Sequence, residues 1–439
     1  MSDLTPASPA VSGHDPRPGV AIVGSGISGL VCAWLLRHQY RVTLFESHHE
    51  PGGHTQTTDV EWQGQSFPVN TGFIVYNDRT YPRFIRLLEL LQVKTKASDM
   101  GFSVHCEQTG LEYNGQGLDR LFAQRRNLLR PAFWGMIRDI LRFNREATRE
   151  VQEQRLDPAE TLGHYLDRQG YGDAFRRYYI IPMGAAIWSA GCAGMLDFPA
   201  AFFLRFFNNH GLLQLRDRPQ WRVIDGGSRE YVRAILDQLP ADSVRLNTAV
   251  TQVHRHEQGV ELELQGPDGL QREAFDQVIM ACHSDQALAL LANPSPDESR
   301  ILKAIPYQGN DVVLHTDVSL LPRNRKVWAA WNYHLDDQQQ QTAAVTYFMN
   351  RLQGFDENTG PFCVTLNRSH AIDPAKIIRR FRYDHPVFTL EGMAAQQEHH
   401  RISGAQHTHY CGAYWFNGFH EDGVRSAERA CKALGVVMP

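Results

Sequence analysis

Cysteine is scarce and scattered in this chain of 439 residues. The seven cysteines stand singly along the sequence, at Cys32, Cys106, Cys192, Cys282, Cys363, Cys411 and Cys431. An odd number of isolated cysteines without a Cys-x-x-Cys pair argues against a disulfide framework and against a structural zinc site. The pattern fits a reducing cytoplasm, in which these residues serve as small buried hydrophobes.

Long apolar runs and an excess of one charge are also missing. No run of 18 apolar residues occurs, which argues against a membrane-spanning helix. The formal net charge is −4, so no global charge attracts nucleic acid, and no nucleic-acid partner is expected. Residues 1–18 lack the basic start and apolar stretch of a signal peptide and are rich in Ser, Pro, Ala and Gly, which predicts a disordered leader.

Histidine is plentiful, with 20 residues, but its clusters do not have the spacing of a metal site. His48-His49, His399-His400, His407 and His409 do not combine i, i+4 spacing on a helix with a carboxylate ligand. We therefore expect surface histidines and no metal. The hydrophobic content of 42% indicates a folded protein of two or three domains.

The most informative stretch begins at Val20. A short β-branched run is followed by a Gly-x-Gly-x-x-Gly turn, formed by Gly24, Ser25, Gly26, Ile27, Ser28 and Gly29. A helical pattern and a second apolar run, which ends at Glu46, complete a βαβ unit that binds dinucleotides. Gly26 lets backbone N–H groups approach a pyrophosphate, Gly29 allows close packing of helix and strand, and Glu46 would accept hydrogen bonds from a ribose.

Similar elements return later in the chain. Strand patterns cover residues 244–264 and 276–282, and the last 35 residues show a strand, a Gly-rich turn and a helix. We predict an α/β fold in which a Rossmann-like domain carries an inserted mixed α+β substrate domain. The expected cofactor domain is discontinuous, with residues 19–77, 220–295 and 405–439, and the substrate domain comprises 78–219 and 296–404.

Further motifs follow in order along the chain. They are Pro51-Gly-Gly-His-Thr55, Asn70-Thr-Gly-Phe73, Asp225-Gly-Gly-Ser228, Thr248-Ala-Val250, Tyr410-Cys-Gly-Ala413 and the Gly418–Ala427 stretch. Together with the Gly-rich turn and Glu46 they resemble the flavin amine oxidase superfamily, which includes phytoene desaturases and protoporphyrinogen oxidases. The resemblance covers about 20–435 and implies an FAD-dependent oxidoreductase with a Rossmann-like domain of the glutathione-reductase/amine-oxidase type and noncovalent FAD.

The resemblance also implies flavin contacts outside the Gly-rich turn and Glu46. Matched residue by residue, they fall on Ser47, Gly53, His54, Thr71, Gly72, Phe73, Val250, Gly412, Ala413, Phe419, Asp422, Gly423 and Val424. In the family, the N-terminus of the last helix points at a flavin carbonyl and stabilises the negative charge of the reduced ring. We expect Gly423 to lie at that helix start.

Three departures from the family pattern bear on the substrate. The family has Gly-Gly-Arg where this chain has Gly53-His54, Gly309–His315 lacks the lysine of the amine oxidases, and Phe419 replaces a tyrosine of the amine-binding pair. These differences argue against a primary amine, and an amine oxidase stays an alternative.

A narrower resemblance concerns residues 70–82, 212–222 and 413–423. They are similar to a bacterial group of predicted FAD-binding proteins that commonly accompany cyclopropane-fatty-acyl synthase-type methyltransferases. This implies a lipid substrate, a long fatty acyl chain that is desaturated or isomerised by hydride exchange with flavin N5. A flavin-binding accessory partner of a lipid methyltransferase is a further alternative.

The catalytic candidates are His54, His420 and Trp415, which would line the flavin end of an apolar tunnel. A histidine is the favoured proton acceptor because its unperturbed pKa lies near neutrality. A structural role for His420 at the start of the last helix is an equal alternative. The apolar stretches 178–188 and 198–207 fit either a core or the tunnel wall.

Residues 124–149 combine seven arginines with aromatic and aliphatic residues at helical spacing. Two interpretations stay open for this segment. It could rest on an anionic lipid surface, which would place the protein peripherally at the inner membrane, or it could be an amphipathic core helix with a solvated, ion-paired face.

Overall fold

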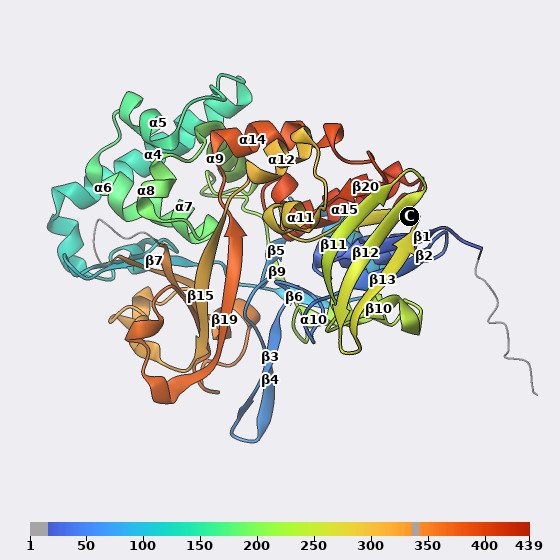
Figure 1. Cartoon of the computed structure of the whole chain (residues 1–439). Coiled ribbons are helices and arrows are strands. Elements are labelled where there is room, and N and C mark those ends of the chain that lie inside the picture. Colours follow the sequence, from blue (N-terminus) through green and yellow to red (C-terminus); the bar gives the residue numbers. More distant parts are fainter. Residues whose placement is uncertain (1–15, 336–341) are drawn as a thin grey trace, which may run out of the picture.

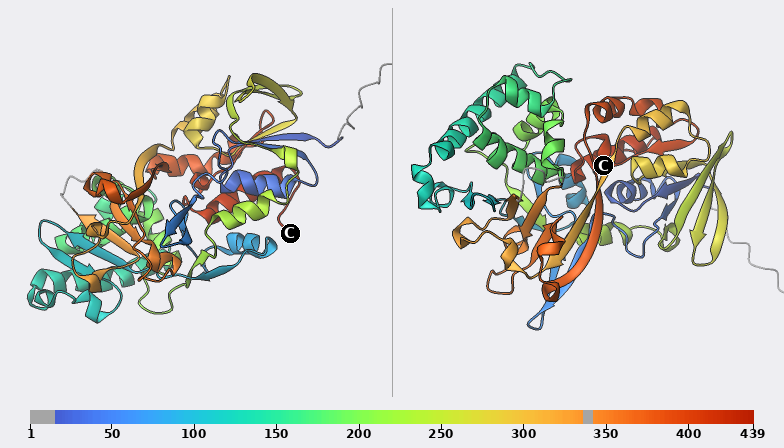
Figure 2. Two further views of the ribbon diagram at one scale, coloured as in Figure 1. Left: turned by 90° about the horizontal axis from the view of Figure 1, so that it is seen from below. Right: turned by 60° about the vertical axis from the view of Figure 1, so that its left-hand side comes forward.

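The computed structural model describes residues 16–335 and 342–439 (Figures 1 and 2). Most of the predicted leader, residues 1–15, lies outside the described residues. Arg17, just before the first strand, donates a hydrogen bond to the carbonyl oxygen of Arg37 at 2.8 Å. None of the described helices is long and apolar enough to cross a membrane.

A five-stranded parallel sheet forms the first layer of the molecule. Its strands, in spatial order, are β10 (Val244–Arg245), β2 (Arg41–Phe45), β1 (Gly19–Val23), β14 (Gln277–Met280) and β20 (Thr408–Tyr410). Four of these strands are buried almost throughout because both faces of the sheet are covered, which explains their continuous apolar runs. Segments from the start, middle and end of the chain thus share one sheet.

Helices cover one face of this sheet and a smaller sheet covers the other. The helices α1 (Ile27–Leu36), α10 (Arg229–Leu236) and α15 (His420–Ala433) share one hydrophobic core, which also includes Phe84 and Leu87 of α2 (Pro82–Leu90). On the opposite face lie β11 (Ala249–His256), β12 (Gly259–Gly266) and β13 (Gly269–Phe275). The predicted domain bounds put α2 in the substrate domain, although α2 packs on α15 of the cofactor domain. These bounds stay a prediction.

A second sheet of seven strands forms the other half of the molecule (Figure 1). In spatial order its strands are β19 (Ile377–Pro386), β15 (Tyr307–His315), β18 (Cys363–Leu366), β17 (Ala344–Phe348), β16 (Trp331–Leu335), β7 (Phe102–Cys106) and β8 (Leu111–Asn114). All neighbours are antiparallel except β16 and β7.

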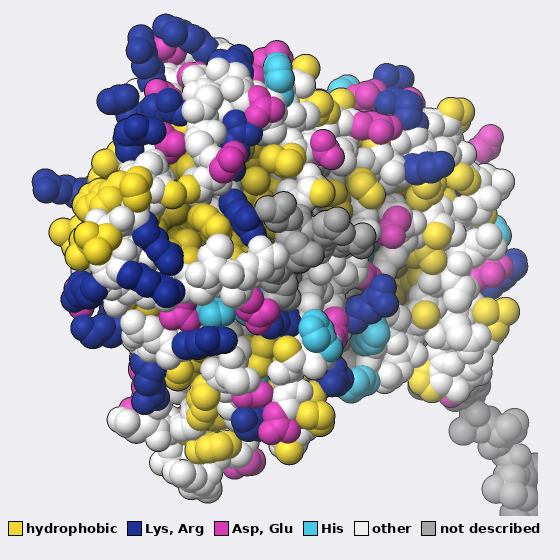
Figure 3. All heavy atoms as spheres, turned by 90° about the vertical axis from the view of Figure 1, so that its left-hand side faces the viewer, with side chains coloured by type: hydrophobic (Ala, Val, Ile, Leu, Met, Phe, Trp, Pro, Cys, Tyr) yellow, Lys and Arg dark blue, Asp and Glu magenta, His cyan; other side chains and the backbone are white. Residues whose placement is uncertain are grey.

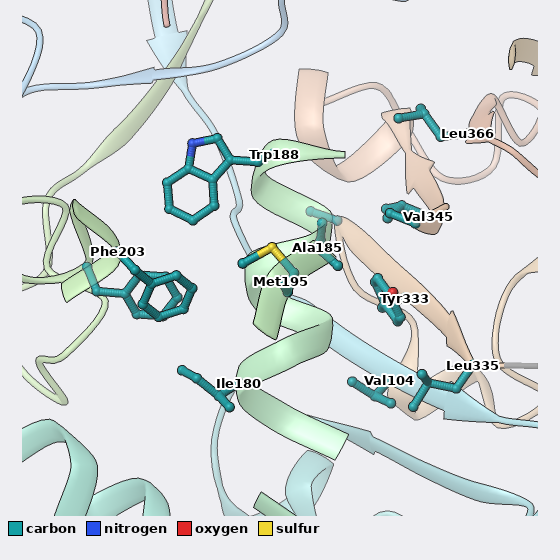
Figure 4. Close-up of a cluster of buried hydrophobic side chains, with 14 of the residues drawn as sticks. Val104, Ile180, Ala185, Trp188, Met195, Phe203, Tyr333, Leu335, Val345 and Leu366 are labelled. Carbon is teal, nitrogen blue, oxygen red and sulfur yellow. The ribbon is translucent and has the colours of Figure 1, made fainter. Parts of the chain in front are cut away.

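Helices from the first half of the chain pack against this second sheet. They include α4 (Pro131–Gln152), α7 (Ile181–Trp188) and α9 (Ala200–Asn209). Figure 4 shows α7 between Phe203 on one side and Tyr333 and Val345 of the sheet on the other. Residues 118–209 are thus mostly helical, and many of their aromatic side chains belong to the core.

The remaining elements are short and connect these layers. They are α3 (Leu118–Leu121), α5 (Leu162–Arg168), α6 (Asp173–Phe175), α8 (Cys192–Leu196), α11 (Ser284–Leu290), α12 (Pro296–Lys303), α13 (Met349–Gln353), α14 (Leu390–Gln397), the hairpin β3 (Thr57–Trp62) and β4 (Gln65–Asn70), and a small sheet of β5 (Tyr76–Asn77), β9 (Trp221–Ile224) and β6 (Thr95–Ala97). The short helical turns η1 (Arg125–Leu129) and η9 (Ala413–Trp415) also matter below.

Candidate functional site

A cavity of about 900 Å³ extends from the carboxyl ends of β1 and β2 to the space beside the second sheet. Ligands of open parallel sheets bind at such carboxyl ends. Of the predicted site residues, the lining includes Gly24, Ser25, Gly26, Ile27, Ser28, Glu46, Ser47, Gly53, His54, Thr71, Gly72, Phe73, Val250, Ala413, Phe419 and His420. The structure therefore brings together residues from every motif that carried the family resemblance except Asp225–Ser228. Ser228 lies behind the wall, where its N–H donates a hydrogen bond to Oδ1 of Asn70 at 2.9 Å.

The Gly-rich turn forms a cradle that a side chain would fill. Gly26 has φ −62° and precedes α1, and a Cβ atom built on it would meet no protein atom within 4 Å. The space beside Gly26 therefore belongs to the cavity, as a bound pyrophosphate requires. By contrast, a Cβ on Gly29 would lie 1.9 Å from the carbonyl oxygen of Gly24, so Gly29 serves the close packing of α1 on β1.

Glu46 lies at the carboxyl end of β2 and is held by three hydrogen bonds. Its Oε2 accepts hydrogen bonds from the backbone N–H and the hydroxyl of Ser25 at 3.0 and 2.5 Å, and its Oε1 accepts one from the N–H of His48 at 3.0 Å. The carboxylate is thus fixed at the cavity wall, next to the Gly-rich turn. This position suits an acceptor for ribose hydroxyls.

The loops that carry Gly53-His54 and Gly72-Phe73 contact each other through their backbones beside the cavity. The carbonyl oxygen of His54 accepts a hydrogen bond from the N–H of Phe73 at 2.8 Å, and a Cβ on Gly72 would come within 2.0 Å of the same oxygen. Gly53 approaches Gly26 so closely that its Cβ would lie 3.1 Å from the Cα of Gly26. The glycines of both motifs are therefore needed for close backbone contact.

Six predicted site residues do not line the cavity. They are Gly29, Gly412, Trp415, Asp422, Gly423 and Val424. Trp415 is only 2% exposed and packs edge-on against His399, with ring centroids 4.5 Å apart. The prediction that Trp415 lines the flavin end is therefore wrong, because the η9 turn directs Ala413 and Tyr414 to the cavity and Trp415 into the core behind them.

Gly423 and Asp422 build the start of α15 rather than the cavity wall. A Cβ on Gly423 would lie 2.5 Å from Cγ2 of Ile27, so this glycine lets α15 cross α1 closely. Asp422 Oδ2 accepts a hydrogen bond from the N–H of Phe419 at 3.0 Å, and burial raises the pKa of this carboxyl to about 7. Phe419 and His420, at the helix N-terminus, are the residues that reach the cavity.

His54 belongs to a cluster of three cavity-lining histidines. Its ring centroid lies 5.9 Å from that of His283, 5.4 Å from that of His385 and 5.0 Å from that of Tyr383. Burial, together with the two neighbouring histidines, lowers the pKa of His54 to about 3, and burial lowers the pKa of His385 to about 4. Nε2 of His54 is buried without a hydrogen-bond partner among the described residues.

His420 is also buried and is already hydrogen-bonded. Its ring stacks on Phe73 with centroids 3.3 Å apart, and its Nε2 lies 3.1 Å from Oγ1 of Thr55 and 3.0 Å from the hydroxyl of Tyr231. Burial lowers the pKa of His420 well below its ordinary value. Burial thus disfavours the protonated form of both His54 and His420. Their role as proton acceptors stays a prediction.

The end of the cavity beside the second sheet is apolar. It is lined by Ile74, Ile187, Trp188, Val312, Trp331, Tyr347, Leu366, Phe381 and Phe388. The stretch 178–188 thus contributes to the wall, whereas 198–207 lies behind it, where Phe198 packs on Trp188 at 4.6 Å between centroids. No lysine lines the cavity within residues 16–335 and 342–439.

One group of described residues has the composition of a metal site, but lies elsewhere. Nitrogen or oxygen atoms of His105, Glu107 and His334 lie within 4.8 Å of one another on β7, β16 and the turn after β7. Glu107 also forms an ion pair with Arg368 at 2.7 Å. Because a permanent cation already contacts this carboxylate, we interpret the group as an ion-pair network, and the expectation of no metal stays a prediction.

Comparison with known proteins decides the family. The family of flavin containing amine oxidoreductases matches residues 27–326. This chain belongs to that family. The family member described here is an FAD-dependent oxidoreductase, so the superfamily, the α/β fold class and the cofactor expected from the motifs are confirmed. No curated protein matches the chain.

Solved structures share the fold at low sequence identity. Cyclohexylamine oxidase from Brevibacterium oxydans IH-35A matches with a TM-score of 0.66 and 17% identity, over 95% of this chain and 99% of the other. Putrescine oxidase bound to putrescine gives 0.65 and 15%, over 95% and 99%. A CLA-producing fatty acid isomerase from P. acnes gives 0.66 and 14%, over 96% and 99%. The likeness covers both halves of this amine oxidoreductase family member.

Sequence reasoning missed His283 and His385. His283 directly follows the predicted strand at 276–282, at the carboxyl end of a parallel strand, and this position could have identified it. His385 lies near the end of β19, a strand that sequence reasoning did not predict because charged residues interrupt its apolar pattern. No local signal pointed to the contact of these residues with His54.

Proposed function

We propose that this enzyme acts on the hydrocarbon part of a long fatty acyl chain. The observation that carries the proposal is the apolar end of the cavity, where the wall consists of aliphatic and aromatic side chains. Such a wall binds hydrocarbon and excludes water. A fatty acid isomerase is among the proteins of the same fold, which supports the proposal without deciding it.

The bound FAD would supply a group that takes up and returns a hydride beside this wall. The surrounding protein residues would hold the substrate and exclude water. Phe419 stacks on Phe206 with ring centroids 5.1 Å apart and would press one side of the chain, while Trp188 and Phe388 form the adjoining wall. Both desaturation and double-bond isomerisation use such a site.

The lowered pKa values of the cavity histidines favour isomerisation over desaturation. In a desaturation the substrate loses a hydride and a proton, so a base must accept the proton. His54 has a pKa of only about 3 and is therefore a weak base for that step. In an isomerisation through a hydride shift the substrate loses a hydride at one carbon and regains one at another, so neither a proton acceptor nor an external electron acceptor is consumed.

The test is anaerobic mixing of the purified FAD enzyme with substrates of each class. We expect monounsaturated or polyunsaturated fatty acids to give products with a shifted double bond, identified by mass spectrometry, without lasting loss of flavin absorbance. Cyclohexylamine and putrescine serve as the competing class. Rapid flavin bleaching by an amine, together with no spectral change and no new product from the lipids, would show that the enzyme is an amine oxidase.

A matched pair of variants connects the result to the apolar wall. Leu366 lies at the cavity and is 5% exposed, whereas Leu314, on the neighbouring strand, is fully buried outside the cavity lining. Leu366→Met and Leu314→Met change both volumes little. We expect Leu366→Met to change the product ratio or the KM for acyl substrates, and Leu314→Met to leave both unchanged.

A further inference from the structure

Exposed apolar side chains gather on one face of the molecule, over η1 and the adjoining half of α4. Leu128, Leu129, Trp134 and Leu141 are 46%, 87%, 48% and 49% exposed. Trp134 is tied to the turn because its Nε1 donates a hydrogen bond to the carbonyl oxygen of Leu128 at 2.9 Å. Figure 3 shows apolar side chains clustered at the upper left of this face, with Lys and Arg side chains around them.

The cluster continues along α4 into a cleft. Trp134, Leu141 and Arg145 recur at helical spacing and share the outer face of α4, while Phe133, Met136 and Phe143 fill the core on the opposite face. The cleft lies between α4 and the 213–216 segment and is lined by Leu141, Leu213, Leu215, Arg145, Arg149 and Arg216 among others. We call the surface formed by Leu128, Leu129, Trp134, Leu141 and Leu215 the α4 patch.

The arginines around the α4 patch give it a positive charge that its own acids do not neutralise. Residues 118–138 contain five arginines and one acid, Asp119, which pairs with Arg125. Within residues 16–335 and 342–439, Arg126, Arg130, Arg145 and Arg216 form no ion pair with any carboxylate. Unpaired arginines beside protruding apolar residues are suited to phosphate head groups above a hydrocarbon layer.

We propose that the α4 patch docks this enzyme on the surface of an anionic lipid bilayer. Leu128 and Leu129 enter the boundary between head groups and acyl chains, and Trp134 lies at the head-group level, where its ring and N–H are both accommodated. Leu129 projects from the tip of a turn rather than lining a groove, which favours a penetrable lipid surface over a rigid protein partner. Docking would give the proposed acyl-chain activity access to membrane lipid, and to that extent rests on it.

Both sequence interpretations of the arginine-rich segment are thereby used. The inner face of α4 is core, and ion pairs such as Arg142–Glu146 at 3.7 Å and Arg149–Glu153 at 3.0 Å lie on its flank. The outer face and the η1 tip carry the unpaired arginines and the exposed leucines. The helix therefore has a structural side and a docking side.

Sedimentation with lipid vesicles tests the proposal on the full-length FAD enzyme. Vesicles of saturated phosphatidylcholine with about one third phosphatidylglycerol are compared with pure phosphatidylcholine vesicles at low and high salt. We expect binding to the anionic vesicles that salt weakens. Leu129→Ser should lower the partition coefficient about tenfold, and Arg126→Gln or Arg145→Gln about fivefold each.

Matched controls come from two strands that do not contribute to the α4 patch. Leu270 on β13 is 65% exposed, and Arg380 on β19 is exposed and, within the described part of the chain, outside any ion pair. Leu270→Ser and Arg380→Gln should leave vesicle binding unchanged. Equal melting temperatures of all variants would show that the folded state is intact.

Two results would overturn the proposal. One is equal binding of the wild-type enzyme to neutral and anionic vesicles; the other is unchanged vesicle binding of the patch variants. Loss of an acidic protein partner in those variants, with vesicle binding intact, would assign the surface to protein recognition instead. Because saturated lipids offer no double bond, this assay is independent of the proposed isomerisation, which is measured with free unsaturated fatty acids.

Discussion

Replacing Gly26 by valine should separate cofactor binding from folding. Gly26 has φ −62°, a value that every L residue adopts, and its Cβ would meet no protein atom within 4 Å. The folded apoprotein should therefore be as stable as the wild type, or more stable by up to ~1 kcal/mol because the unfolded chain loses freedom. The new side chain would instead occupy the space beside the helix N-terminus.

The expected loss of FAD affinity follows from the hydrogen bonds that the valine displaces. If the pyrophosphate loses two backbone N–H donors at ~1.5 kcal/mol each, the loss is ~3 kcal/mol, or about 100-fold in Kd. Titration of apoprotein with FAD, followed by calorimetry or flavin fluorescence, measures this quantity, and thermal unfolding of the apoprotein measures the stability.

Two other glycine variants serve as controls for Gly26→Val. Gly135→Ala on α4 also meets open space and should change neither FAD affinity nor, beyond a small gain, stability. Gly29→Ala should impair both, since its Cβ would collide with the carbonyl oxygen of Gly24. Wild-type FAD affinity in Gly26→Val, or a marked loss of apoprotein stability, would refute the cradle assignment.

Three further changes have expected outcomes. Gly423→Ala should lower the free energy of unfolding by ~1–3 kcal/mol, because its Cβ would press on Ile27; an unchanged melting temperature would contradict the close crossing of α15 and α1. The pKa of Asp422 is raised to about 7 in the folded state, so the folded state binds the extra proton and stability should fall as pH rises from about 4 to 7; Asp422→Asn should flatten this part of the melting-temperature profile, and a profile identical to wild type would count against it. Arg255 and Glu298 form a buried ion pair at 2.5 Å, so Glu298→Gln should cost ~3–5 kcal/mol in urea unfolding, and Arg255→Met combined with Glu298→Leu should cost less; additive losses would argue against coupling.

The first half of the cofactor site could be predicted from sequence because its elements are neighbours along the chain. The turn from Gly24 to Gly29 and Glu46 belong to one βαβ unit, in which spacing alone fixes the geometry. The strands of the parallel sheet were predictable for a different reason, since buried strands form uninterrupted apolar runs. The strand β19 was not, because its outward face carries Arg380 and Arg382.

The chemistry of the histidines could not be predicted from sequence. The pKa of a side chain depends on how much water surrounds it in the folded protein, and sequence does not show that His283 and His385 would surround His54. The prediction that Trp415 lines the cavity failed for a similar reason, since the conformation of a single turn decides which of its side chains reaches the cavity. The association with a lipid methyltransferase stays a prediction, because it came from resemblance alone.

The parallel sheet combines strands from distant parts of the chain, which has a consequence for folding during synthesis on the ribosome. Strand β20 pairs with β14, and α15 packs on α1, yet both emerge about 360 residues after β2. At typical rates of synthesis the first βαβ unit therefore waits roughly 20–70 s for its last partners. During that time the apolar face of α1 and the open edge of β14 are exposed to chaperones, and a nascent chain released before residue 405 would keep them exposed.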